Sequence, residues 1–271
     1  MALKLTEINI YPIKSTRRIA LETSDVLAAG LPWDRRWMLV DVQGRFITAR
    51  QHPRLALVET RFDGAVLRVS AAGNDVLDVP LADAARGRIG VTVWKDSLEA
   101  PCVSAEADAW FSAYLGFACR LVRMTDDVVR PVNPVYGLAG DRVSFADGFP
   151  LLVISEASLD DLNRRLARPV SMRRFRPNLV VSGCEPYAED RWRRLRVGAV
   201  EFEGVKPCSR CVFTTIDPDT GAKDPDLEPL RTLGTYRRRD TSVFFGRNLI
   251  PRVLGRIRVG DPVEVLALDP A

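Results

Sequence analysis

Two cysteines separated by a serine and an arginine form the most reactive stretch of this sequence. Cys208 and Cys211 lie within residues 205–221, where a pair of threonines and an Asp-Pro-Asp-Thr-Gly turn follow them. A Cys-x-x-Cys pair is typical of half a zinc site, of a redox disulfide, or of a single reactive thiolate. The pair therefore poses the question of which chemistry this protein performs.

The surroundings of the pair disfavour zinc and redox chemistry. Structural zinc needs a second pair of Cys or His ligands, but the single histidine, His52, and the other three cysteines stand apart in the sequence. A redox pair normally opens a helix beside a βαβ unit, whereas β-branched residues and a proline-containing turn follow Cys211. Two small buried cysteines would be unremarkable, yet Ser209 and Asp217 are poor core material. We favour one cysteine acting as a thiolate ligand or nucleophile, beside Arg210; a zinc-stabilised β-protein stays an alternative.

Basic side chains at expected strand ends indicate an anionic ligand. Lys14, Arg35, Arg50 and Arg176 each lie beside a predicted strand, and each taken alone could equally be a solvated strand end. Together they could converge on a phosphate, with backbone amides and hydroxyl groups completing the site. No G-x-S-x-G, Walker or G-x-G-x-x-G motif is present, so nucleotide and serine-hydrolase chemistry have no support.

The composition is that of an ordinary soluble globular protein and does not suggest a nucleic-acid-binding or membrane protein. The 271 residues contain 39 Lys and Arg against 35 Asp and Glu, and a net charge of +4 does not suggest nucleic-acid binding. The N-terminus lacks the apolar core of a signal peptide, and no apolar run is long enough for a membrane span. Five cysteines, an odd number, favour a reducing compartment, so we expect a cytoplasmic protein without a membrane partner.

The first hundred residues alternate between short apolar runs and turns, as in a β-barrel or sandwich. Asp63-Gly64 is a favoured hairpin turn, and Gln43-Gly44 marks a second hairpin. We expect strands at 3–12, 36–42, 45–50, 55–61, 65–70, 75–81 and 89–95. A helix follows at 104–116, where Ser104 can cap its start and Gly116 can end it.

The second half mixes strands with a helix. We expect strands at 120–124, 151–154, 179–182, 195–197, 199–202, 242–245 and 262–266. Ser155 can cap a helix whose leucines at 159, 162 and 166 share one face. Residues 125–146 have the prolines and glycines of a loop, and we place a domain boundary near its start. The fold class is α+β, mostly β.

Several motifs in fixed order resemble the MOSC-domain molybdenum enzymes, in the group that includes the mitochondrial amidoxime-reducing component and its bacterial relatives. The motifs are YPIKS, DRRW, TARQ, FADGFPLLVISEASLDDLN, FRPNLVVSGCEPYAED and KPCSRCVFTTIDPDTG, and the resemblance runs from about residue 3 to residue 268. It implies a MOSC N-terminal β-barrel domain over residues 1–122 and a mixed, β-rich MOSC domain over residues 123–271.

The resemblance also implies a molybdenum cofactor, a molybdopterin held by both domains with one cysteine on the metal. The family's ligand matches Cys211, while Cys208 stays a possible ligand. Asp147 matches a family acid near the molybdenum, where it could handle the protons that reduction of an N–O bond consumes. Positions matching the family's cofactor contacts are Lys14, Ser15, Arg35, Arg176, Asn178, Ser209, Arg210 and, less closely, Asn248. We add Arg50 for its charge and its place at a strand end.

The implied activity is reduction of small N-hydroxylated substrates such as amidoximes, hydroxylamines and N-hydroxylated bases. Many bacterial relatives carry a C-terminal ferredoxin-like domain, but no cysteine follows Cys211 here. We therefore expect a separate electron donor: a ferredoxin, a flavoprotein or a b-type cytochrome. The alternative is a module that carries molybdopterin or sulfur without turning over a substrate.

Overall fold

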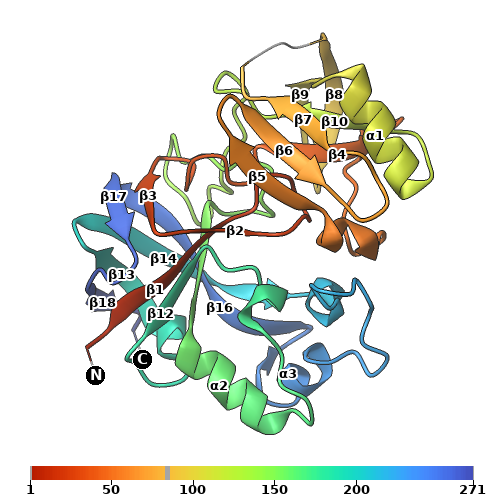
Figure 1. Cartoon of the computed structure of the whole chain (residues 1–271). Coiled ribbons are helices and arrows are strands. Elements are labelled where there is room, and N and C mark those ends of the chain that lie inside the picture. Colours follow the sequence, from red (N-terminus) through yellow and green to blue (C-terminus); the bar gives the residue numbers. More distant parts are fainter. Residues whose placement is uncertain (1, 83–85, 271) are drawn as a thin grey trace.

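The computed structural model describes residues 2–82 and 86–270. Its larger part is a nine-stranded sheet with the order β18-β13-β14-β16-β11-β12-β1-β2, in which β15 also pairs with β16 (Figure 1). The strands are β1 (Lys4–Ile10), β2 (Ile19–Leu21), β11 (Leu151–Ser155), β12 (Leu179–Ser182), β13 (Trp192–Val197), β14 (Val200–Arg210), β15 (Arg238–Arg239), β16 (Ser242–Val253) and β18 (Val263–Leu268). The β11–β12 pair is parallel, and β1 pairs antiparallel with β12. The first strand of the chain therefore belongs to a sheet otherwise built mainly from its second half.

A smaller part, in the upper half of Figure 1, is made of short antiparallel ladders. They are β4 (Trp37–Asp41) with β10 (Cys119–Arg123), β5 (Glu59–Asp63) with β6 (Val66–Ser70) and β7 (Leu77–Pro80), and β8 (Arg88–Val93) with β9 (Asp96–Pro101). Single bridges such as Arg45 with Thr92 connect ladders. A further ladder, β3 (Thr23–Val26) with β17 (Gly255–Arg258), joins segments from both ends of the chain. The prediction of an α+β, mostly β fold is confirmed, while the division after residue 122 stays a prediction.

Both expected helices form where their capping residues predict them. The Ser104 side chain accepts a hydrogen bond from the Ala107 N–H at 3.0 Å at the start of α1 (Ala105–Leu115), and Gly116 ends this helix with a φ of 81°. The Ser155 side chain caps α2 (Glu156–Arg165) in the same way. No helix in the described ranges has the length and apolarity that crossing a membrane requires.

The expected elements differ from the observed ones where pairing partners decide the outcome. The hairpin at Gln43-Gly44 forms, because the Asp41 N–H donates to the Arg45 carbonyl and the Ile47 N–H donates to the Leu39 carbonyl. The expected strand does not reach residue 50, because the Thr48 carbonyl accepts the N–H groups of residues 51 and 52 in a turn. A 3-10 helix, Pro53–Leu57, follows this turn. Elements absent from the expectations are β2, β3, β9, β15, β17, α3 (Leu230–Tyr236) and the 3-10 turns Met172–Arg174, Ala188–Arg191 and Val212–Thr215. By contrast, β14 and β16 are longer than the expected strands, and β14 continues into polar residues, because the two strands pair along most of their length.

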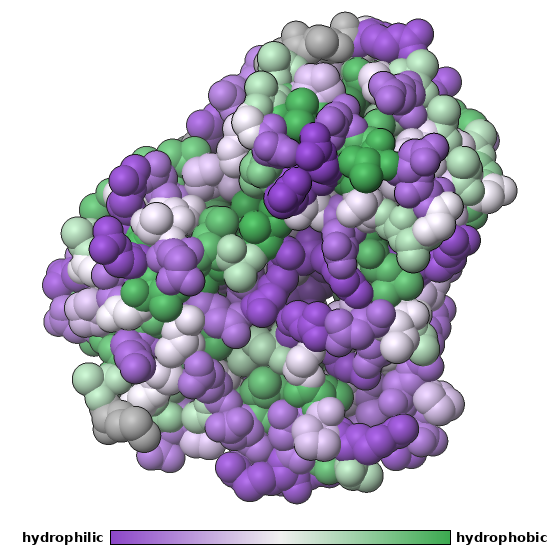
Figure 2. All heavy atoms as spheres, viewed as in Figure 1, coloured by the Kyte–Doolittle hydropathy of each residue, from purple (hydrophilic) through white to green (hydrophobic). Residues whose placement is uncertain are grey.

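Each of the two parts has an apolar core of its own. One core contains Trp37 and Phe111, both fully buried, and packs α1 against the small ladders. The other contains Leu5 and Phe202 and lies under the large sheet. The space-filling view shows a hollow between the parts, bordered largely by hydrophilic residues (Figure 2).

Candidate functional site

All eleven residues predicted for the site line a single pocket between the two parts. The pocket encloses about 790 Å³ free of protein atoms, its open mouth included. These residues are Lys14, Ser15, Arg35, Arg50, Asp147, Arg176, Asn178, Ser209, Arg210, Cys211 and Asn248. The structure thus brings every predicted position together, while their roles stay predictions.

Strand ends supply most of the pocket wall. Lys14 lies four residues beyond the end of β1, and Arg35 lies just before β4. Arg176 precedes β12, while Ser209 and Arg210 end β14, directly before Cys211. These strands bring their pocket residues together because β1, β12, β14 and β16 lie in one sheet, so residues as far apart in the sequence as Lys14 and Asn248 line one cavity.

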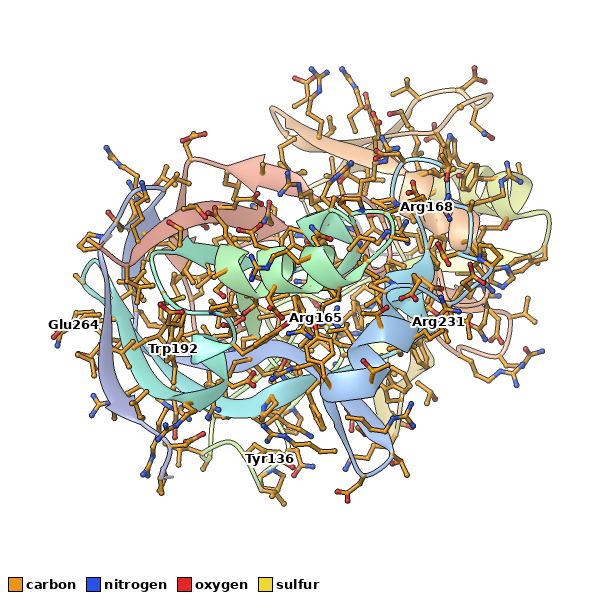
Figure 3. The ribbon with its side chains drawn as sticks, turned by 90° about the horizontal axis from the view of Figure 1, so that it is seen from below. Tyr136, Arg165, Arg168, Trp192, Arg231 and Glu264 are labelled. Atoms are coloured by element: carbon orange, nitrogen blue, oxygen red, sulfur yellow. The ribbon has the colours of Figure 1, made fainter. Side chains whose placement is uncertain are left out.

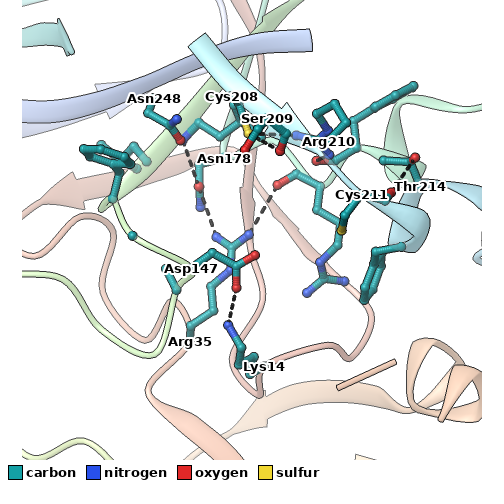
Figure 4. Close-up of a pocket in the computed structure, with 18 of the residues that line it drawn as sticks. Lys14, Arg35, Asp147, Asn178, Cys208, Ser209, Arg210, Cys211, Thr214 and Asn248 are labelled. Carbon is teal, nitrogen blue, oxygen red and sulfur yellow. Dashed lines mark hydrogen bonds and ion pairs between the residues drawn. The ribbon is translucent and has the colours of Figure 1, made fainter. Parts of the chain in front are cut away.

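A chain of contacts links the lysine at the pocket floor to the second cysteine. Lys14 Nζ donates to Asp147 Oδ1 at 2.6 Å (Figure 4). Arg50 Nη2 donates to Asp147 Oδ2 at 2.8 Å. Arg50 Nε also donates to Cys211 Sγ at 3.2 Å. One guanidinium therefore bridges the carboxylate and the sulfur through its planar fork of donors.

The Lys14–Asp147 pair places a titratable group close to neutral pH. Burial lowers the pKa of Lys14 to about 8, although Asp147 opposes the shift. Burial by itself would raise the pKa of Asp147, but the charges of Lys14 and Arg50 outweigh it and hold that pKa below its usual range. The Asp147 side chain is 58% exposed, whereas that of Lys14 is 6% exposed. The acid thus faces the pocket as a carboxylate, and the lysine behind it is the group that can exchange a proton near neutrality.

The loop that carries Asp147 is held by an arginine that the sequence did not single out. Arg130 is buried, and its guanidinium donates to the carbonyls of Ser144, Ala146 and Asp147 at 2.9, 2.5 and 3.0 Å. Its Nε is paired with Asp96 at 2.8 Å. Because one rigid guanidinium binds three carbonyls of this loop, Arg130 fixes the position of Asp147.

Trp94 is a second residue that the sequence did not reveal. It lies in the two-residue turn between β8 and β9 with a φ of 58°. Its Nε1 donates to Asp147 Oδ1 at 3.3 Å, and the Arg50 guanidinium lies 4.6 Å from its ring centroid. Asn, Asp and Gly are the usual residues at such turns. A large aromatic side chain at a turn position is therefore the feature of the sequence that could have indicated a role for Trp94.

Arg35 and Asn178 form a buried support on the opposite wall. The Asn178 Oδ1 accepts from Arg35 Nη1 at 3.0 Å, and its Nδ2 donates to the Asn9 carbonyl and to Asp34 at 3.1 and 3.0 Å. Both polar groups of the amide are therefore engaged within the protein, and Asn178 orients Arg35. The Arg35 and Arg176 guanidiniums lie 4.2 and 4.0 Å from the ring centroid of Tyr11. Burial lowers the pKa of Arg176 to about 10, so the group stays charged at neutral pH.

Three pocket residues adopt a backbone conformation that side chains disfavour. Ser15, Arg35 and Arg176 have φ values of 75°, 48° and 57°, and each left-handed residue of this kind costs about 1–3 kcal/mol. All three lie in connections between strands and line the pocket. Such strain concentrates at binding sites, where the surrounding structure keeps it in place.

The two cysteines differ in their surroundings. All five cysteines are free, and within residues 2–82 and 86–270 no cluster of three or more His, Cys, Asp or Glu could hold a metal ion. Cys208 Sγ accepts from Arg210 Nη1 at 3.1 Å, two residues along the same strand. Cys211 caps the 3-10 turn at Val212–Thr215 and shares Arg50 with Asp147. Cys211 is therefore the cysteine coupled to the pocket acid.

The charge of the pocket fits an anionic, phosphate-bearing group with a thiolate ligand. Its cationic lining residues outnumber Asp147, its acidic one, by five to one; the cations are Lys14, Arg35, Arg50, Arg176 and Arg210. Arg210 Nε is buried without a hydrogen-bond partner among the described residues, although buried donors are normally satisfied. A cysteine sulfur, a surplus of guanidiniums and an unused donor are the features that such a group requires.

Comparison with known proteins agrees with this geometry. The MOSC N-terminal beta barrel domain matches residues 2–118, and the MOSC domain matches residues 140–264. Mouse mitochondrial amidoxime-reducing component 1 is 38% identical, covering 97% of this chain and 82% of the relative. The chain belongs to the MOSC-domain family.

Other MOSC-domain relatives extend over the same length. The human mitochondrial amidoxime-reducing component 1 is 36% identical over 97% of this chain and 82% of the relative. The rat mitochondrial amidoxime reducing component 2 is 39% identical over 96% of this chain and 82% of the relative. The regions that match the two MOSC family models, residues 2–118 and 140–264, contain every predicted site residue.

Proposed function

We propose that this protein is a molybdenum cofactor-dependent reductase of N-hydroxylated compounds, with amidoximes, hydroxylamines and N-hydroxylated bases as its substrate class. The observation that carries the proposal is the chain of contacts from Lys14 through Asp147 and Arg50 to Cys211. It places a proton source and a prospective metal ligand in one cationic pocket. The names of the relatives supply the reaction class.

In this proposal Cys211 Sγ ligates the metal, and the basic wall holds the pterin and its phosphate. Arg35, Arg176 and Arg210 offer guanidinium forks suited to phosphate. Ser15, Ser209 and Asn248 add neutral polar groups in the same pocket. When bound, the cofactor supplies the electrons for cleavage of the N–O bond.

The protein's own residues would deliver protons. Reduction of R–NHOH to R–NH₂ and water consumes two electrons and two protons, one of which must reach the departing oxygen. Lys14 holds its proton with a pKa of about 8 and donates to Asp147, which faces the pocket. Lys14 is thus the proposed proton reservoir, Asp147 is the relay to the substrate, and Arg50 holds the relay beside Cys211.

Electrons would come from a separate donor protein, for which a ferredoxin, a flavoprotein and a b-type cytochrome are the candidates, and the proposed compartment is the cytoplasm. Cofactor analysis together with an activity assay tests the proposal. The purified protein should contain molybdenum and a pterin and should reduce benzamidoxime with a chemical electron donor. The metal content of the Cys211→Ala variant should fall by more than about tenfold, whereas the Cys208→Ala variant should keep its metal.

Three outcomes would contradict parts of this proposal. A metal-replete protein inactive on every N-hydroxylated compound would refute the reductase. Full metal in Cys211→Ala would move the ligand to Cys208. A persulfide on Cys211 without tightly bound metal would instead favour a molybdopterin or sulfur carrier.

A further inference from the structure

An aromatic groove leads outward from the pocket. Its four rings belong to Phe46, Trp94, Tyr136 and Phe149. The groove and the pocket share Asp147, Gly148 and Phe149 as lining residues. The groove is therefore continuous with the pocket at the acid that we place beside the reacting group.

The four rings form two pairs from different parts of the fold. Phe46 and Trp94 belong to the smaller part, with ring centroids 5.1 Å apart. Tyr136 and Phe149 belong to the segment between β10 and β11, with centroids 5.8 Å apart in an edge-to-face arrangement. The view from below shows Tyr136 at the outer margin of the molecule (Figure 3). The rings thus extend from the shared acid to the molecular surface.

These rings keep substantial apolar surface in contact with solvent. Trp94 is 47% exposed and Tyr136 is 36% exposed, although aromatic rings gain free energy from burial. The carboxylates in the groove are already paired, Asp96 with Arg130 at 2.8 Å and Asp147 with Lys14 at 2.6 Å. The Lys206 ammonium lies 4.7 Å from the centroid of the Tyr136 ring. A flat, apolar ligand would cover the rings without stripping an unpaired carboxylate of water.

We propose that this groove binds the planar aromatic body of an N-hydroxylated substrate while its N-hydroxyl group lies in the pocket at Asp147. The inference rests on the proposed function and names the aryl amidoximes as the preferred substrates. Trp94 couples the two regions, because its ring lines the groove and its Nε1 donates to Asp147 Oδ1 at 3.3 Å. A substrate that lacks an aromatic body, such as acetamidoxime, makes the same contact at Asp147 but leaves the rings uncovered.

Tyr136 is the ring to remove, because it is partly exposed and has no contact with Asp147 among the described interactions. In the cofactor-loaded protein with a chemical electron donor, Tyr136→Ala should raise the KM for benzamidoxime roughly five- to tenfold. The KM for acetamidoxime should change less than about twofold, and kcat should hold for both substrates. Tyr136→Phe keeps the ring and should preserve most of the preference. Val135→Ala, at a neighbouring residue that is 78% exposed and does not line the groove, is the matched control.

Equilibrium binding separates this inference from the reductase activity. Calorimetric titration with benzamidine and acetamidine, the reaction products, requires no turnover. Benzamidine should bind the wild-type protein more tightly, and Tyr136→Ala should weaken its binding roughly five- to tenfold, while acetamidine binding should not respond. If neither oxime is reduced but benzamidine still shows this pattern, the reductase proposal fails and the groove's aromatic preference stands.

Other results would overturn the groove. Equal binding of the two amidines to the wild-type protein would do so, as would equal KM changes for the two oximes in Tyr136→Ala. A Tyr136→Ala defect seen only with a protein electron donor would assign these rings to the donor instead.

Discussion

Lys14 and Asp147 lie 133 residues apart in the sequence and form a 2.6 Å ion pair at the floor of the pocket. The lysine is nearly buried and the carboxylate faces the cavity. Because burial lowers the pKa of Lys14 to about 8, this pair joins a proton donor active near neutrality to a group that can contact a substrate.

The pair predicts an activity limit on the alkaline side. The protonated lysine is the required form, so kcat/KM for benzamidoxime should fall as pH rises through about 8. Arginine stays protonated throughout this range, so Lys14→Arg should remove that limb even if its rate is lower. The measurement is the pH profile of each variant at equal cofactor content. An unchanged alkaline limb in Lys14→Arg would assign it to another group.

Arg50 is predicted to act through the two separate hydrogen bonds that its guanidinium donates, and not through its positive charge alone. Its Nε reaches Cys211 and its Nη2 reaches Asp147, and an ammonium cannot make both contacts in that geometry. Arg50→Lys should therefore lower kcat about tenfold while most cofactor stays bound. Combined with Asp147→Asn, the loss should be clearly less than additive, because both changes break the same contact. Strict additivity would show that the two residues act independently.

Arg176 is predicted to hold the anionic end of the cofactor. Its guanidinium lies between Tyr11 and Phe213, with ring centroids at 4.0 and 5.1 Å. Removing a partly buried fork that would contact the cofactor's phosphate should weaken cofactor retention roughly tenfold or more, so Arg176→Ala should be purified with little pterin. Arg168→Ala removes an arginine whose side chain is 82% exposed and should leave pterin content unchanged. Equal pterin content in the two variants would exclude Arg176 from the cofactor site.

Gly246 provides a test of the fold itself. It lies in β16 with a φ of 81°, and a Cβ there would come within 2.6 Å of Ile154 Cγ1 and 2.8 Å of the Val153 carbonyl. Strain and overlap together should lower the free energy of unfolding of Gly246→Ala by about 2–4 kcal/mol. Gly64 has a φ of 58° with no atom within 4 Å of a Cβ, so Gly64→Ala should cost only about 1–2 kcal/mol. Urea denaturation of the two variants measures the difference; comparable losses would mean that the β11–β16 packing yields to the extra carbon.

The local signals of the sequence determined much of the secondary structure. Ser104 and Ser155 cap helices as expected because an N-cap needs only its own hydroxyl and the next turn of backbone. Local signals in the sequence did not predict the full length of β14. Its last residues are polar and become strand through pairing with β16, so a partner about forty residues away decides their conformation.

The candidate site divides along the same line. The resemblance to the MOSC-domain enzymes, with the charge of Arg50 at a strand end, predicted eleven site residues from the sequence alone, and all of them line the pocket. Residue types in a fixed motif order are readable in this way because they are properties of the chain itself. The tertiary structure decided how they are joined: Arg50 bridges Asp147 and Cys211, and Lys14 lies behind the acid. The contacts of Trp94 and Arg130 with Asp147 were found only in the tertiary structure. They depend on which distant segments fold beside the hairpin turn that carries Trp94 and beside the buried Arg130 side chain.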